Sequence, residues 1–233
     1  MMPPTEYDVE RETEFASQQF RTTIPNKLNE LLEKLDQSRG RVESWYADLV
    51  VKISLSIGRV CNDLLKTTEQ DALPAAAWNA RNLLELWVWT KYCSTSRSNA
   101  RRFHEDAVRD FMGLAALHSK MCEVAGVYDA LGAVGPDKLM KIAADQLGRA
   151  TIDANYTSVL EAAKSLGLEV LYKAHNQFLS KLAHPTAGLV VGIMHQSDDS
   201  LRSLQASCTT MGLYYAGQCV IAMEETVSAI SRP

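Results

Sequence analysis

The chain lacks the features that mark several broad classes of protein. Its 233 residues include 5 cysteines, none of them in a CxxC pair, so neither a disulfide framework nor a structural zinc site is predicted. The 24 Lys and Arg residues against 28 Asp and Glu give a net charge of -4, which excludes bulk electrostatic attraction to nucleic acid or an anionic membrane. We expect free, buried thiols and a reducing compartment.

Long apolar runs are missing as well. The richest stretch, residues 83–92, is interrupted by Glu85 and Lys91, so no membrane span is predicted. The segment from Met1 to Arg11 is polar and has no apolar core of the kind found in signal peptides. There is no glycine-rich phosphate loop either. These absences predict a cytoplasmic protein without a bound cofactor and without membrane partners.

Helical periodicity is what the sequence has in abundance. Apolar residues recur at three- and four-residue steps, and no stretch alternates as a half-buried strand does. The pattern predicts an all-α fold, an up-and-down helical bundle with additional shorter helices. Its expected core helices are 41–68, 72–95, 99–125 and 198–231. Shorter helices are expected at 136–149, 155–165 and 168–182, with a loop at 185–197.

The N-terminal region carries two breaks in the helical pattern. A first helix over residues 6–23 is expected to stop before Pro25, and a second piece is expected to end at Gly40. The sequence therefore predicts an N-terminal helical arm of residues 1–40 and a helical bundle domain of residues 41–233.

A polar seam interrupts one apolar helix near its end. Tyr172, Asn176, Ser180 and His184 follow one another at four-residue steps, and Pro185 ends the helix. Because each step drifts by about 40° around the axis, the seam reduces to a Ser180–His184 pair with Asn176 nearby. The serine could be a nucleophile activated by the histidine, or His184 could act as a general base. Alternatively, His184 only caps its own helix.

Two charged groups lie in another apolar stripe. Arg81 and Glu85 are spaced i to i+4, between Trp78 and Trp89. A buried charge pair of this kind could position His184 or bind a phosphate or carboxylate through the arginine fork. The alternative is an intrahelical salt bridge that stabilises the bundle. The candidate catalytic residues are His184, Ser180, Arg81, Glu85 and Asn176, and the candidate phosphate-binding residue is Lys181.

Histidine spacing does not predict a metal site. The intervals among His175, His184 and His195 match no compact metal motif. His104 and His118 share a helix, but neither has a carboxylate at the i+3 or i+4 position. His175 lies on an apolar stripe, which favours a satisfied core histidine.

Two short segments carry a resemblance to a known family. Arg81 to Glu85, followed by Trp89 and Tyr92, and Ser180 to Pro185 resemble uncharacterised bacterial all-helical proteins that are distantly similar to the HEPN superfamily. The resemblance implies a helical bundle, commonly dimeric, and a ribonuclease of a toxin or antiviral system that works without metal. Its motif is an arginine separated from a histidine by four to six residues.

The chain departs from that motif at the seam. Gln177, Phe178 and Leu179 occupy the positions where the arginine would precede His184, so the motif is absent there. Arg97 and His104 have the formal spacing. The first hypothesis is a HEPN-like module of a bacterial defence, stress or toxin system, directed at RNA or a nucleotide. The alternative is a non-catalytic dimerisation or protein-interaction module, which requires an exposed apolar surface. Both predict a homo-oligomer or a partner protein.

Overall fold

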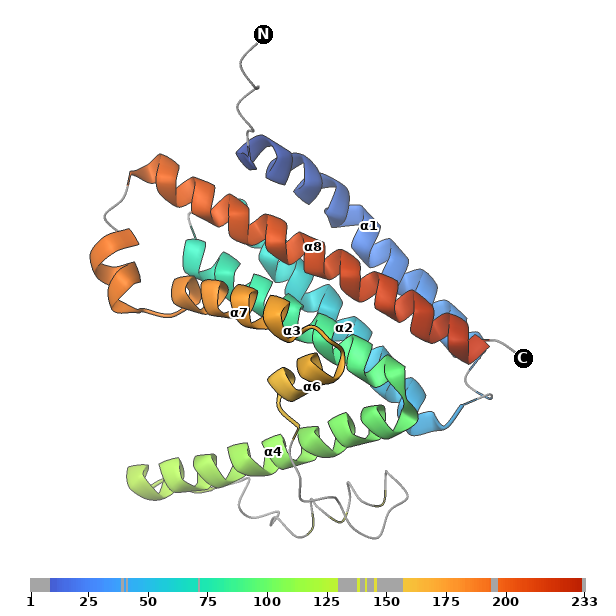
Figure 1. Ribbon diagram of the computed structural model, residues 1–233. Coiled ribbons are helices and arrows are strands. Elements are labelled where there is room, and N and C mark those ends of the chain that lie inside the picture. The colour runs from blue at the N-terminus through green and yellow to red at the C-terminus, as the bar shows by residue number, and fades with distance from the viewer. Residues whose placement is uncertain are drawn as a thin grey trace.

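The computed structural model describes residues 9–38, 40, 42–70, 72–129, 138, 141, 145, 157–193 and 197–231, and none of these lies in a strand. The all-α bundle is confirmed (Figure 1). The helices are α1 (Val9–Gln37), α2 (Ser44–Thr67), α3 (Leu73–Thr95), α4 (Arg97–Ala125), α6 (Val159–Ser165), α7 (Glu169–Ala183), the π-helical turn η3 (Gly188–Gly192) and α8 (Asp198–Ser231). None of the described helices is long and apolar enough to cross a membrane.

The core lies among α1, α2, α3 and α8, and α7 packs on the remaining side of α3 (Figure 1). Side chains that are almost completely buried fill it from every one of these helices, and the largest include Leu35, Ile57, Leu83, Leu179 and Tyr215. All five cysteines are buried free thiols, as expected. The three- and four-residue spacing of these apolar positions is the reason why each helix presents one face to the core.

Two expectations for the N-terminal region differ in their outcome. The break at Pro25 is wrong, because α1 continues through it from Val9 to Gln37. Ile24 and Leu28 are buried on either side of this proline, so packing against the bundle outweighs the hydrogen bond that Pro25 cannot make. The boundary at residue 40 stays a prediction. Within residues 1–40, α1 lies along α8 and α2.

Small residues let α8 approach α3 closely. Ala76 and Ala80 on α3 and Ala216 on α8 are fully buried. A Cβ on Gly212 would lie 2.4 Å from Leu64 Cδ2 and 3.2 Å from the Cα of Ala80. Only glycine therefore fits at this crossing without a shift of its neighbours.

The placement of α4 corrects the predicted core. The expected helix over 99–125 exists, but it projects from the bundle, and α1 takes its place among the core helices (Figure 1). Ser96 caps its start by accepting a hydrogen bond from the amide of Asn99, 3.1 Å away. Gly126, at φ +66°, ends it as expected. Helical periodicity does not say which apolar faces meet, which is why the sequence misplaced this helix.

The shorter elements are close to their expected positions. Ser158 and Glu161 form a capping box that starts α6. The expected loop at 185–197 instead contains the π-helical turn η3. The helix expected over 136–149 lies outside the described residues apart from three helical positions. Together, α6 and α7 cover the outer side of α3, where the predicted polar groups lie.

Candidate functional site

A polar network joins α3 to α7 at the predicted site. Arg81 Nε donates a hydrogen bond to Asn176 Oδ1, 2.8 Å away, and Arg81 Nη2 lies 2.7 Å from Glu85 Oε1. Both charged side chains are 23% exposed. Since Arg81 binds one partner along its own helix and another across the interface, the pair is more than an intrahelical salt bridge. It fixes the register of α7 on α3.

Tyr172 completes this network. Its hydroxyl lies beside the carboxylate of Glu85, close enough for each group to influence the pKa of the other. Burial raises the pKa of Glu85, although the nearby Arg81 and Tyr172 act in the opposite direction. Burial and then the Glu85 charge raise the pKa of Tyr172 to about 12. The tyrosine therefore stays neutral beside the carboxylate, and Arg81 remains the group that joins Asn176 and Glu85.

His184 lies at the exposed end of the network. Its backbone N–H donates to the carbonyl of Ser180, 3.2 Å away, and the residue is the C-cap of α7. Its ring meets Trp78 edge-on at 5.5 Å, and the guanidinium carbon of Arg81 lies 5.7 Å from the ring of Trp78. His184 and Arg81 thus both lie against the ring of Trp78.

Ser180 and Lys181 do not join the other candidates. Within the described part of the chain, no hydrogen bond connects the side chains of Ser180 and His184, and Lys181 is exposed. The structure brings Arg81, Glu85 and Asn176 together, whereas Ser180 lacks the contact that an activated nucleophile needs. This arrangement stabilises the α3–α7 interface and leaves one accessible imidazole beside an indole.

The other histidines have separate partners. His175 hydrogen-bonds to the buried hydroxyl of Tyr215, which confirms the expected core role. His104 packs against Trp45 on α2, and burial, reinforced by Lys52, lowers its pKa. Arg97, which has the formal motif spacing to His104, stacks 3.4 Å above the ring of Tyr46. His195 lies outside the described residues.

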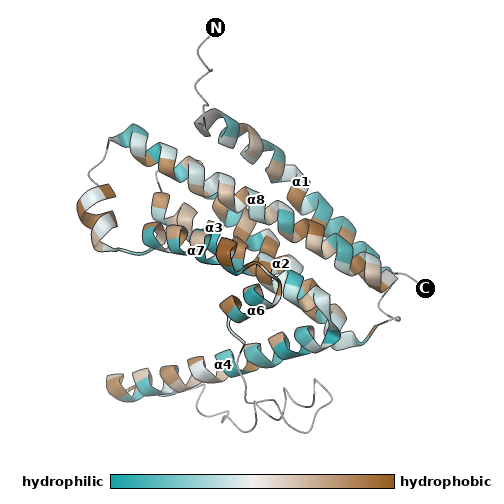
Figure 2. Cartoon of the chain, viewed as in Figure 1, coloured by the Kyte–Doolittle hydropathy of each residue, from teal (hydrophilic) through white to brown (hydrophobic). Residues whose placement is uncertain are grey.

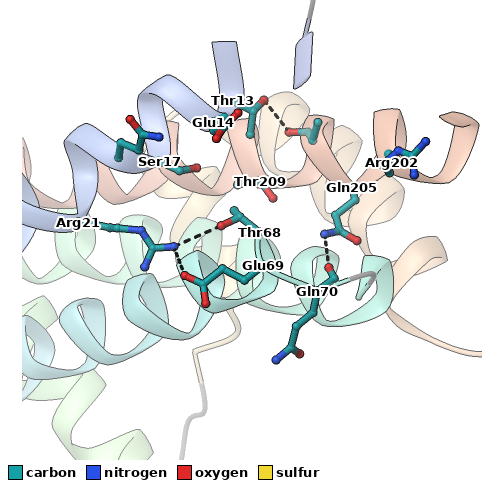
Figure 3. A pocket seen from close by; sticks show the side chains of 12 residues that line it. Thr13, Glu14, Ser17, Arg21, Thr68, Glu69, Gln70, Arg202, Gln205 and Thr209 are labelled. Carbon is teal, nitrogen blue, oxygen red and sulfur yellow. Dashed lines mark hydrogen bonds and ion pairs between the residues drawn. The ribbon is translucent and has the colours of Figure 1, made fainter. Parts of the chain in front are cut away.

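A cleft that the sequence did not predict lies between α1, α8 and the turn from α2 to α3 (Figure 3). Its volume is about 580 Å³. Arg21 donates hydrogen bonds to the Leu65 carbonyl and to Glu69, at 3.2 and 2.7 Å. Gln205 donates to the carbonyls of Thr67 and Gln70, each 2.7 Å away, and so holds the turn on α8.

Two hydroxyls in this cleft have no hydrogen-bond partner among the described residues. Ser17 Oγ and Thr209 Oγ1 are buried and unpaired, although their residues line the cavity. Arg21 and Arg202 are offset by Glu14 and Glu69, so the lining has no charge preference. The described lining residues carry hydroxyl, amide and charged groups, so the cleft offers hydrogen-bonding sites for water or a small polar molecule. The sequence could have indicated this cleft only if the packing of α1 against α8 had been predicted.

An apolar stripe runs along the outside of α4. We define the α4 stripe as four residues spaced three, four and three apart: Leu114, Leu117, Met121 and Val124. Each is at least 62% exposed, and Val127 and Tyr128 extend the apolar surface beyond the helix. Figure 2 shows hydrophobic residues at this projecting end. The sequence predicted the helix over 99–125 as a core helix, whereas the structure leaves these four side chains exposed.

Comparison with protein-family models, curated proteins and solved structures gives no match. The distant similarity to the HEPN superfamily stays a prediction. Function is therefore inferred from the side-chain geometry of the α3–α7 network, the cleft and the α4 stripe.

Proposed function

We propose that this protein is a helical interaction module that forms a homodimer through the α4 stripe. The single observation that carries this proposal is the exposure of Leu114, Leu117, Met121 and Val124 on a projecting helix. Large apolar side chains in a continuous exposed row are typical of protein interaction sites. The contacts that join Arg81 to both Asn176 and Glu85 support a structural role for the polar network, as a non-catalytic module requires.

The spacing of the stripe favours a second copy as its partner. Steps of three, four and three residues form the a and d seam of a coiled coil, which is complementary to itself under two-fold symmetry. With Val127 and Tyr128, six side chains present roughly 500 Å² of apolar surface, at about 80 Å² each. Two copies would hide about 1,000 Å², the lower limit for a specific interface. A concentration-dependent dimer is the expected form.

The test is the mass of the purified chain in solution. We expect twice the mass of one chain by light scattering, falling towards the monomer on dilution. Leu117→Glu with Met121→Glu should give a monomer with an unchanged thermal midpoint. Val170→Glu is the matched control, because Val170 is an 83% exposed apolar residue on α7 and its variant should still dimerise. A wild-type monomer at all concentrations, or a dimer that survives the double substitution, would refute the proposal.

A second candidate is an RNA-directed, HEPN-like function in a bacterial defence, stress or toxin system. The observation that favours it is the accessible pair of His184 and Trp78, with Arg81 beside the indole. An aromatic ring and a cation are the groups on which an unpaired base can stack. The buried free thiols support the cytoplasmic location that this function requires.

This candidate is tested with RNA and purified protein. Cleavage should disappear in His184→Ala without a change in thermal midpoint, and Trp78→Ala should weaken RNA binding. His104→Ala tests the formal Arg97–His104 motif separately. Cleavage that persists in both histidine variants would assign the activity to a contaminant and reject the HEPN-like function.

A further inference from the structure

Three metal-ligating side chains meet at the far end of α4, beside the turn that ends this helix. His118 and Cys122 are spaced i to i+4 on one face of α4, and Asp129 follows the helix. One donor atom from each of the three lies within 4.8 Å of the others. We propose that His118, Cys122 and Asp129 bind one divalent ion of borderline softness, Zn²⁺ or a metal of similar preference.

A defined turn brings the aspartate back to the helix. Gly126 has the left-handed conformation, its amide donates to the Glu123 carbonyl, and the amide of Val127 donates to the Cys122 carbonyl 3.0 Å away. This pair of bonds is a Schellman motif. It reverses the chain, so that Asp129 Oδ1 lies 3.1 Å from His118 Nδ1 and Oδ2 accepts a hydrogen bond from Ser119. Asp129 lies beyond the end of α4, which is why this carboxylate is not found at the i+3 or i+4 position from His118.

The donor separations fit a tetrahedral ion. Zinc lies about 2.0–2.2 Å from nitrogen and oxygen and about 2.3 Å from sulfur, so a tetrahedral angle places nitrogen roughly 3.4 Å from oxygen and 3.6 Å from sulfur. The observed separations from His118 Nδ1 are 3.1 Å to the Asp129 oxygen and 3.6 Å to the Cys122 sulfur. The Cys122 sulfur also lies 3.8 Å from Nε2, almost as close as it lies to Nδ1. Binding of the ion through Nδ1 therefore requires a rotation of the imidazole about χ2, which is a broad torsion.

Ligand chemistry and access favour zinc over magnesium or calcium. Thiolate and imidazole select Zn²⁺ and related ions, whereas Mg²⁺ and Ca²⁺ take oxygen ligands. The His118 side chain is 43% exposed and that of Asp129 22%, so the ion can enter from solvent. Three protein ligands leave the fourth position to water, as in zinc sites that act on substrates. The Ser119 hydroxyl orients Asp129 by its hydrogen bond.

The alternative is a cluster held by hydrogen bonds alone, with Asp129 accepting from Ser119 and His118. Co²⁺ distinguishes the two, because a thiolate ligand gives a charge-transfer band that an oxygen or nitrogen ligand does not. We expect the chelator-treated full chain to bind one Co²⁺ or Zn²⁺ per chain and to show this band. Cys122→Ser should abolish the band, and His118→Gln or Asp129→Asn should weaken Zn²⁺ binding by roughly tenfold or more.

His104→Gln is the matched control, because it removes a histidine from the same helix at a place remote in sequence from the cluster. It should bind Zn²⁺ as the wild-type chain does, and circular dichroism should show the same helix content for all variants. A chain that binds neither ion after chelation and reloading overturns the proposal. So does a thiolate band that persists in Cys122→Ser, which would assign the metal to another cysteine.

Discussion

The crossing of α3 with α8 and the outer half of α4 use similar helical patterns in opposite ways. At the crossing, Ala80 and Gly212 bring two backbones together and leave no room for another methyl group. Along α4, Leu114 and Val124 point into solvent, and a Cβ on Gly113 would meet nothing within 4 Å. The difference teaches that an apolar stripe predicts burial without saying whether the partner is the same chain or another molecule.

The largest expected effect tests this contrast directly. Gly212→Val should lower the free energy of unfolding by about 3 kcal/mol, because the added methyl groups meet Leu64 and the backbone of Ala80. Gly113→Val is the matched control and should change it by less than about 0.5 kcal/mol. Urea unfolding followed by circular dichroism measures both. If Gly212→Val and Gly113→Val lower the free energy of unfolding equally, the α3–α8 crossing is not packed more tightly than the exposed face of α4.

A smaller effect is expected where polar groups close the α3–α7 interface. Arg81→Ala should lower the free energy of unfolding by about 2 kcal/mol, because it leaves Glu85 without its cation and Asn176 without its hydrogen-bond donor. Lys173→Ala removes an exposed ion pair with Glu169 and should cost less than about 0.5 kcal/mol. The measurement is again urea unfolding. If the two variants lose the same stability, the network does not fix helix register.

The smallest effect concerns the cleft, where the bundle leaves polar groups unpaired. Thr209→Val should raise the free energy of unfolding by up to about 1 kcal/mol, because the buried hydroxyl has no partner to lose. Thr226→Val is the matched change in the same helix and should lower it by about 1 kcal/mol, since Thr226 Oγ1 donates to the Ala222 carbonyl. Thermal melts of both variants give the sign. A lower free energy of unfolding for Thr209→Val would indicate that the Thr209 hydroxyl binds an ordered water in the cleft.

Properties within a helix were predictable from the sequence. The all-α class, the Gly126 cap and the pairing of Arg81 with Glu85 all follow from spacing along one chain segment. The interpretation of Pro25 as a break failed because tertiary packing on α1 outweighs one lost hydrogen bond.

Properties between helices were harder to predict. Asn176 meets Arg81 across 95 residues, and that meeting was anticipated only because both groups lay in otherwise apolar stripes. The cleft, and the approach of Asp129 to His118, depend on which faces meet and on how a turn reverses the chain. Spacing alone does not encode either of them.

The side chain of Gln205 has a consequence for the order of folding. Its amide oxygen accepts from the backbone of Ala72, and its nitrogen donates to the carbonyls of Thr67 and Gln70, so it links segments 133 to 138 residues apart. Until α8 docks, the turn between α2 and α3 must satisfy these groups with water. Closing so long a stretch of chain is entropically costly and slows folding. The α2–α3 hairpin is therefore expected to gain full protection from hydrogen exchange only in the last, cooperative step, when α8 arrives.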